Sequence, residues 1–300
     1  MRFPKLKCLF VLFALLLDAP ADAEGVPVIS KIAAHPAIWV VRGRDVTAYF
    51  LGSVHVLPPN VTWHTPELDA AIASSDTFVF EAPIDDSGQA AGQEFIRQHG
   101  MLAPDTALPS LLDAKTLKDY RAALALTHVP AETLDHLRPW LAGVVLELAL
   151  ARMENYSPDS GVDRQVFAIA KSTGRSVRYF ETVDQQLSML MPQNQKLELA
   201  EFDAGLKELQ TESGELGPLV DAWSRGDAAE VGRLVNTDLE GDREAKKVLL
   251  DDRNDAWVKQ LRRMLAEPHT YFITVGAGHL VGPHGVPALL RKAGYRVDGP

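Results

Sequence analysis

Two histidines in matching contexts are the residues of this sequence best suited to chemistry. His55 lies in Gly52-Ser53-Val54-His55 and His279 in Gly276-Ala277-Gly278-His279, and in each case a proline follows four residues later. Each motif comes after an apolar run, 47–51 or 271–275, that is typical of a buried strand. A neutral imidazole can bind a divalent metal or move a proton. Taken alone, either histidine would be interpreted as an ordinary loop or capping residue; the repeated context favours a shared site.

Two glutamates occupy similar positions at the ends of predicted strands. Glu81 directly follows the apolar residues 78–80, and Glu181 follows the predicted strand 177–180. In open α/β sheets, ligands bind beyond the carboxyl ends of the strands, so both carboxylates are candidates for the crevice that the histidines face. The alternative for Glu81 is a structural pair with a nearby arginine.

Three further polar residues are candidates for supporting roles. Asp163 opens a predicted helix that runs to Ala170, either as a capping or first-turn residue or as part of the site. Arg253 and Asn254 lie in a predicted helix that continues through Leu261. If the inward face of that helix meets the crevice, Arg253 can hold a substrate carboxylate or pair with Glu81; otherwise it only bridges helices.

The elements that would position these side chains define an α/β fold. A hairpin of strands 37–42 and 47–51 delivers the first motif, and a helix over 65–74 follows it. The second motif is followed by a helix over 286–292 and another short strand, so the unit strand–GxxH–helix–strand occurs twice. Glycines Gly52, Gly276 and Gly278 allow sharp turns and close backbone approach there. We expect a parallel-rich central sheet with a large helical insertion between Asp85 and Met264.

The first 23 residues are predicted to be a signal peptide that is removed. Arg2, Lys5 and Lys7 precede an apolar run, and Ala21-Asp22-Ala23 matches a cleavage site. The single cysteine, Cys8, lies inside this peptide, so any metal site in residues 24–300 must use histidine, carboxylate and water. We therefore expect a periplasmic or secreted protein without stable membrane insertion.

The composition excludes some classes of partner and reaction. The net charge is −10, and no cluster of lysine and arginine lies beyond the predicted signal peptide, which argues against nucleic acid as a partner. The sequence also lacks HExxH, GxSxG, Walker A and CxxC motifs. The glycines of 276–282 resemble a dinucleotide fingerprint, but Pro283 interrupts the helix start and too little chain remains to complete a Rossmann sheet.

The paired GxxH motifs with Phe80-Glu81 between them resemble the TraB/Tiki/GumN family, and the bacterial GumN-like branch in particular. The resemblance extends from about Ala37 to Val297 and includes Arg138-Pro139-Trp140, Gly161-Val162-Asp163, Glu181-Thr182, Arg253-Asn254 and Gly276 to Leu280. Residues 24–300 would then form one TraB/GumN-like domain, on a scaffold similar to that of the erythromycin esterases and haem-iron-uptake proteins.

The resemblance implies a metal-dependent hydrolase, most similar in chemistry to metalloproteases. His55, Glu81 and His279 would bind a divalent cation, Mn, Co or Zn, and leave a position open for water. Glu81 would be either the third ligand or the general base. The substrate would be a peptide or another small carbonyl compound, and a homodimer is an expectation of the resemblance. The alternative is a non-catalytic exported protein that binds a metal, haem or another ligand through the same histidines.

Overall fold

A mixed β-sheet forms the centre of the structure. The computed structural model describes residues 31–211, 216–239 and 242–300, and within them a six-stranded sheet has the order β6-β5-β7-β3-β2-β8. Its strands are β2 (Ile38–Arg42), β3 (Thr47–Ser53), β5 (Thr77–Phe80), β6 (Ser176–Tyr179), β7 (Thr270–Gly276) and β8 (Val297–Asp298). The first four in spatial order are mutually parallel, whereas β2 runs antiparallel to both of its neighbours. This confirms an α/β fold with a sheet that is rich in parallel pairs.

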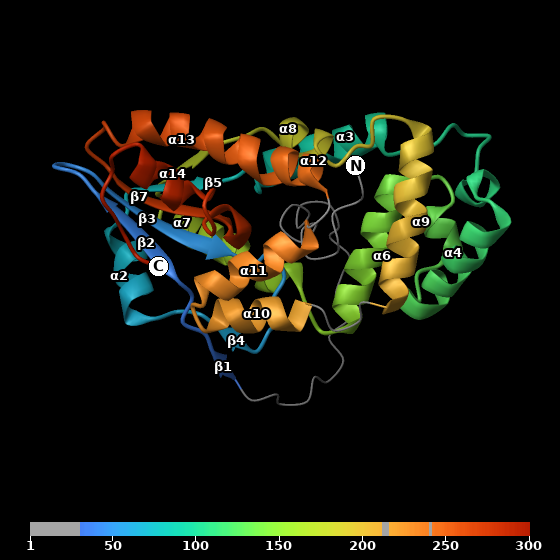
Figure 1. Cartoon of the computed structure of the whole chain (residues 1–300), viewed down its shortest axis with the longest axis horizontal. Coiled ribbons are helices and arrows are strands. Elements are labelled where there is room, and N and C mark those ends of the chain that lie inside the picture. The colour runs from blue at the N-terminus through green and yellow to red at the C-terminus, as the bar shows by residue number, and fades with distance from the viewer. Residues whose placement is uncertain (1–30, 212–215, 240–241) are drawn as a thin grey trace.

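Helices cover both faces of this sheet (Figure 1). Alternate residues of each strand enter different cores: Phe78 and Phe272 belong to one, and Val79 and Ile273 to the other. The first core includes side chains of α2 (Pro66–Ser74) and α7 (Val162–Ser172), and the second includes those of α13 (Asp252–Met264) and α14 (Val286–Lys292). The central strands are thus buried on both faces, as their continuous apolar sequences predicted.

The predicted elements around the first motif are confirmed. β2 and β3 form an antiparallel hairpin, with Arg42 opposite Thr47. The helix predicted over 65–74 is α2, in which the Thr65 hydroxyl accepts a hydrogen bond from the Leu68 N–H and Pro66 occupies the first turn. A separate pair of short strands, β1 (Ile32–Ala33) and β4 (Val61–Thr62), lies beside this region.

The remaining helices include a lobe at one end of the molecule. There α4 (Ala114–Thr127), α6 (Pro139–Met153) and α9 (Gln195–Thr211) lie side by side (Figure 1) and share buried residues such as Tyr120 and Phe202. The other helices are α3 (Asp86–His99), α5 (Ala131–Leu134), α8 (Val183–Ser188), α10 (Leu216–Ser224), α11 (Ala228–Asp238) and α12 (Arg243–Lys246), with short turns η1 (Leu108–Leu111), η2 (Pro158–Ser160), η3 (Lys247–Asp251) and η4 (Ala277–His279).

The expectation of one large helical insertion between Asp85 and Met264 was wrong in detail. β6, which confirms the strand predicted over 177–180, lies within that span and pairs with β5, while α7 and α13 cover the two faces of the sheet. The apolar periodicity of these helices does not reveal whether they face the sheet or another helix.

The segment 130–153 is divided into α5 and α6, because proline lacks the N–H that a continuing helix needs and Pro139 is the first residue of α6. Gly217 and Pro218 belong to the first turn of α10.

The strand–GxxH–helix–strand order does occur twice, but the two units end differently. After α2 the chain forms β5, which lies in the parallel centre of the sheet beside β7. After α14 it forms β8, which pairs antiparallel with β2 at an edge. The two units therefore match from the first strand through the histidine to the helix, and they differ in the strand that follows.

The described residues include no helix that is both long enough and apolar enough to cross a membrane. The predicted signal peptide, residues 1–23, lies outside the described residues.

Candidate functional site

The parallel strands bring the predicted site residues together at one edge of the sheet. His55 follows β3 by two residues, Glu81 directly follows β5, and Glu181 follows β6 by two residues. β3 and β7 are adjacent and in register, with Ser53 opposite Gly276. The two motifs also pack directly on each other, because a Cβ on Gly52 would lie 2.9 Å from the Ala277 Cα. The close approach that Gly52 permits is therefore to the second motif.

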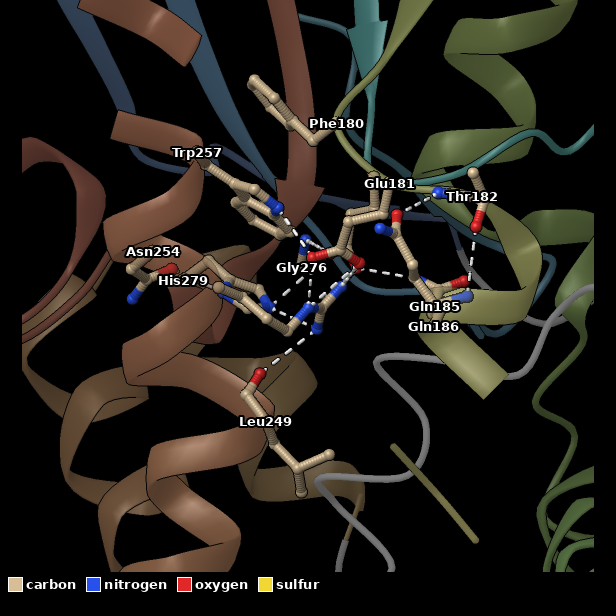
Figure 2. A network of polar contacts seen from close by, with 12 residues as sticks. Phe180, Glu181, Thr182, Gln185, Gln186, Leu249, Asn254, Trp257, Gly276 and His279 are labelled. Carbon is tan, nitrogen blue, oxygen red and sulfur yellow. Dashed lines mark hydrogen bonds and ion pairs between the residues drawn. The ribbon is translucent and has the colours of Figure 1, made fainter. Parts of the chain in front are cut away.

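Arg253 forms the centre of a buried ion-pair network at this edge. Figure 2 shows the network, with its members Glu181, Trp257 and His279 labelled. Its Nη2 lies 2.5 Å from Glu81 Oε2 and 2.9 Å from Glu181 Oε2, and its Nε lies 2.9 Å from Glu181 Oε1. Trp257, one turn later on α13, has its ring centroid 4.7 Å from the guanidinium carbon and donates its indole N–H to Glu181. Arg253 is only 4 % exposed, so these contacts are made away from water.

Glu81 is held as a carboxylate by several donors. In addition to Arg253, the Gly276 N–H donates to its Oε1 at 2.6 Å and the Gln186 side-chain amide donates to its Oε2 at 3.0 Å. Burial alone would raise the pKa of Glu81, but Arg253 above all, together with the neighbouring histidines and the Gly276 N–H, lowers it to about 2. For Glu181 burial prevails, and its pKa is raised despite Arg253.

His279 is oriented by Asn254. The Asn254 amide nitrogen donates to the His284 carbonyl, so its Oδ1 accepts from His279 Nδ1 at 2.7 Å. Nε2 then carries the lone pair, and it accepts a hydrogen bond from Arg253 Nη1 at 3.0 Å. Burial and the positive charge of Arg253 together lower the pKa of His279 to about 3. This imidazole is therefore neutral over the physiological pH range.

His55 is oriented by Asp163 and has a free nitrogen. Its Nδ1 lies 3.0 Å from Asp163 Oδ1, which also accepts from the Ser53 hydroxyl at 2.9 Å. Its Nε2 is buried and has no hydrogen-bond partner among the residues that the structure describes. Burial would lower the pKa of His55, but Asp163, with a smaller contribution from Glu81, raises it.

Asp163 combines the two roles that the sequence left open. It is a first-turn residue of α7, whose N-cap is Gly161, and it is also the buried partner of His55. The Val162 N–H donates to the Val54 carbonyl, and a Cβ on Gly161 would lie 2.4 Å from the His55 carbonyl oxygen. The start of α7 and the His55 loop are thus in direct backbone contact.

The donor chemistry suits a divalent cation in part. Both histidines are anchored through Nδ1 by a side-chain acceptor, the arrangement usual for imidazoles that bind metal through Nε2, and the buried Nε2 of His55 has no other partner. However, Arg253 bonds to both His279 and Glu81. In this arrangement, the described residues include no group of three His, Asp or Glu side chains close enough to hold one ion.

Several residues of the network lay outside the sequence expectations. Gln186 on α8, Trp257 on α13 and Ser53 within the first motif all bond to site carboxylates. Ser53 lies inside the first GxxH, so its position was a usable signal. A glutamine on a helix carries no such signal.

Other candidates have a structural place. At the start of α6, Arg138 pairs with the buried Glu198 at 2.6 Å and Trp140 is fully buried. Gly278 lies in η4, where a Cβ would be 3.3 Å from Val235 Cγ1.

Comparisons with known proteins identify the family to which this chain belongs. The profile of the TraB/PrgY/gumN family matches residues 37–299. An uncharacterized protein of Treponema pallidum is 25 % identical over 269 residues, covering 85 % of this chain and 80 % of the relative. The uncharacterized protein YbaP of Escherichia coli and that of Shigella flexneri are each 25 % identical over 263 residues, covering 85 % of this chain and 92 % of theirs. No solved structure matches significantly. The chain belongs to the TraB/PrgY/gumN family.

Proposed function

We propose that this protein is an exported metal-dependent hydrolase that acts on peptides or other small carbonyl compounds. The observation that carries the proposal is the buried, unpartnered Nε2 of His55, on an imidazole whose other nitrogen is fixed by Asp163. A buried ring nitrogen without a partner is costly, and one aimed into a polar cluster is a reason to expect a ligand there. Family membership and the predicted signal peptide provide the context for the proposal.

In this proposal, His55, His279 and Glu81 would hold the cation. A bound divalent cation would lower the pKa of a water molecule and polarise the scissile carbonyl. Mn, Co and Zn all suit imidazole and carboxylate donors.

The protein's own residues would prepare the site. Asp163 and Asn254 fix the two rings through Nδ1, which leaves Nε2 of each histidine as the nitrogen that would bind the cation. Glu81 stays ionised at neutral pH because of its low pKa. It would then serve either as the third ligand or as the base that takes a proton from water.

Metal uptake by the purified protein tests the proposal. We expect about one equivalent of Mn, Co or Zn per chain after loading, and loss of that metal in His55→Ala and His279→Ala variants that remain folded. His64→Ala is a suitable control, because His64 lies at the surface beside Asp69. Failure of the unsubstituted protein to bind any of the three metals would overturn the proposal.

Hydrolysis is the second stage of the test. Peptide and ester libraries would be screened with the loaded protein, with the His55→Ala variant as the blank. Metal binding without turnover of any substrate would favour a non-catalytic binding protein. Mass spectrometry of protein recovered from the exported fraction tests the localisation, since the proposal expects a chain that begins at Glu24.

A further inference from the structure

Arg253 is bonded to two of the three groups that the proposed function assigns to the metal. Its Nη2 donates to Glu81 and its Nη1 to His279 Nε2. Glu81 and His279 are themselves close, with 3.9 Å between Oε1 and Nε2. A cation held by both groups would therefore lie beside the guanidinium, in competition for the same lone pairs.

The hydrogen-bonding capacity of Arg253 is fully used. A guanidinium has five N–H donors. Nε donates to Glu181, Nη2 to Glu181 and Glu81, and Nη1 to His279 and to the Leu249 carbonyl (Figure 2). Arg253 has no donor left for a substrate carboxylate, so the role in substrate binding that its position suggested would require an existing bond to break.

The contacts of Arg253 fall into two sets. Those to Glu81 and His279 involve the proposed metal ligands. Those to Glu181, Leu249 and the face of Trp257 involve none of them. Glu181 accepts from both Nε and Nη2, and bidentate pairs of this kind are among the strongest that arginine makes. The second set can hold the guanidinium without the first.

The positive charge of Arg253 disfavours the binding of metal ions that have a low affinity for Glu81 and His279. A divalent cation at His279 and Glu81 would lie close to the permanent positive charge of Arg253, in a site with little water to screen the repulsion. The cation must also replace two bonds that Arg253 already makes. Metals with high affinity for imidazole can meet this cost more readily than Mg²⁺ or Ca²⁺, which prefer oxygen ligands.

We propose that Arg253 sets the metal affinity of this site, as an internal cation that occupies Glu81 and His279 and that would have to retreat onto Glu181 for a divalent metal to bind there. The inference rests on the proposed function, because it assumes that these groups are metal ligands. It predicts that the site binds metal more weakly than the same ligands would without the arginine.

The test measures metal affinity in the purified full chain, without any activity assay. Zn²⁺ affinity is obtained by competition with a chromogenic chelator, and Mn²⁺ affinity from the electron paramagnetic resonance signal of the free ion. Arg253→Met removes the charge and is expected to bind both metals at least about tenfold more tightly, since two charged hydrogen bonds no longer oppose binding. Arg253→Lys keeps the charge and should remain closer to the unsubstituted protein.

Two further variants make the result interpretable. Arg253→Met leaves two buried carboxylates without their partner, so the double variant Arg253→Met/Glu181→Gln provides a second measurement if the single variant does not fold. Arg138→Met is the matched control, because it removes an arginine paired with Glu198, outside the metal-ligand cluster. Its metal affinity should equal that of the unsubstituted protein.

The outcomes separate this inference from the proposed function. Equal affinity in the unsubstituted protein and the Arg253→Met variants, or weaker affinity in those variants, would overturn the inference and leave the hydrolase proposal standing. An absence of binding in every form, including the double variant, would overturn the proposed function itself. Tighter binding in the Met variants with little change in Arg253→Lys and Arg138→Met would support both.

Discussion

The two ends of the parallel strands carry similar residues in different surroundings. At the carboxyl ends, His55 Nδ1 lies 3.0 Å from Asp163, and both side chains are 9 % exposed. At the amino ends, His269 Nδ1 lies 2.9 Å from Asp76, and the side chains are 37 % and 49 % exposed. The two pairs have nearly the same length, so distance alone does not distinguish them.

The same contrast holds for the arginines. Arg178, within β6, and Glu267, which precedes β7, pair at 3.0 Å with more than two fifths of each side chain exposed. Arg253 and its two glutamates are almost entirely buried. Exposed pairs are screened by water and contribute little to stability, whereas a buried charge that loses its partner is strongly destabilising. Burial therefore marks the carboxyl ends as the edge where these residues perturb one another most strongly.

The largest effect on stability is expected when a buried arginine is substituted, and an exposed arginine provides the comparison. Arg253→Met should lower the free energy of unfolding by about 3–5 kcal/mol, because Glu81 and Glu181 would remain buried without their counter-ion. Arg178→Met, its exposed counterpart, should change stability little. Urea denaturation of the metal-free proteins measures both. Equal losses in the two variants would show that burial is not the relevant difference.

An intermediate effect is expected from the two His–Asp pairs. Asp163→Ala leaves His55 Nδ1 and the Ser53 hydroxyl without their acceptor and should cost about 1–3 kcal/mol. Asp76→Ala should cost less than about 1 kcal/mol, and less still at high salt. Asp163→Ala should also weaken metal affinity by about 10–100-fold, while Asp76→Ala leaves it unchanged. A similar decrease in affinity for both variants would point to a general loss of structure.

The smallest and most specific effect concerns the protonation of the two site histidines in metal-free protein. His279 has a pKa of about 3, below the ordinary 6.5, so its contribution to stability is complete above pH 6.5 and is lost as the pH falls from 6.5 toward 3. His55 has a raised pKa, so its contribution is complete below pH 6.5 and is lost as the pH rises through the folded-state pKa. Proton NMR titration of the imidazole C–H resonances should show His55 changing protonation above pH 6.5 and His279 unchanged down to pH 4. Titration of both near pH 6.5 would contradict the network described for them.

Much of the carboxyl edge was predictable because parallel strands place their ends together. The positions of His55, Glu81, Glu181 and His279 after apolar runs are linear features of the sequence, and the rule for open α/β sheets turns them into a spatial cluster. The start of a helix, such as Thr65-Pro66, is also predictable from the local sequence, because capping involves residues that are neighbours in the chain.

What could not be predicted depends on contacts between distant segments. Gln186 reaches Glu81 only because α8 packs against the end of β5, and nothing in the local sequence encodes that approach. The pairing of Arg253 with Glu81 was one option among several, since the rotation of α13 about its axis decides which residues face the strands. The edge position of β8 likewise depends on pairing with β2 rather than on its own residues.

The rotation of α13 depends in turn on a wide helical turn. Residues 243–264 form a continuous helical segment, in which Lys247–Asp251 are a π-helical turn between α12 and α13. Such a turn accommodates one extra residue without ending the helix. Leu249, Leu250, Arg253 and Asn254 of this segment are all buried. Since each residue of an α-helix adds about 100° of rotation, deleting one residue here would turn α12 and α13 relative to each other by roughly that angle. Chain length in this segment is thus as strict a requirement as residue identity, and an alignment of relatives could test it by the absence of gaps between Arg243 and Asn254.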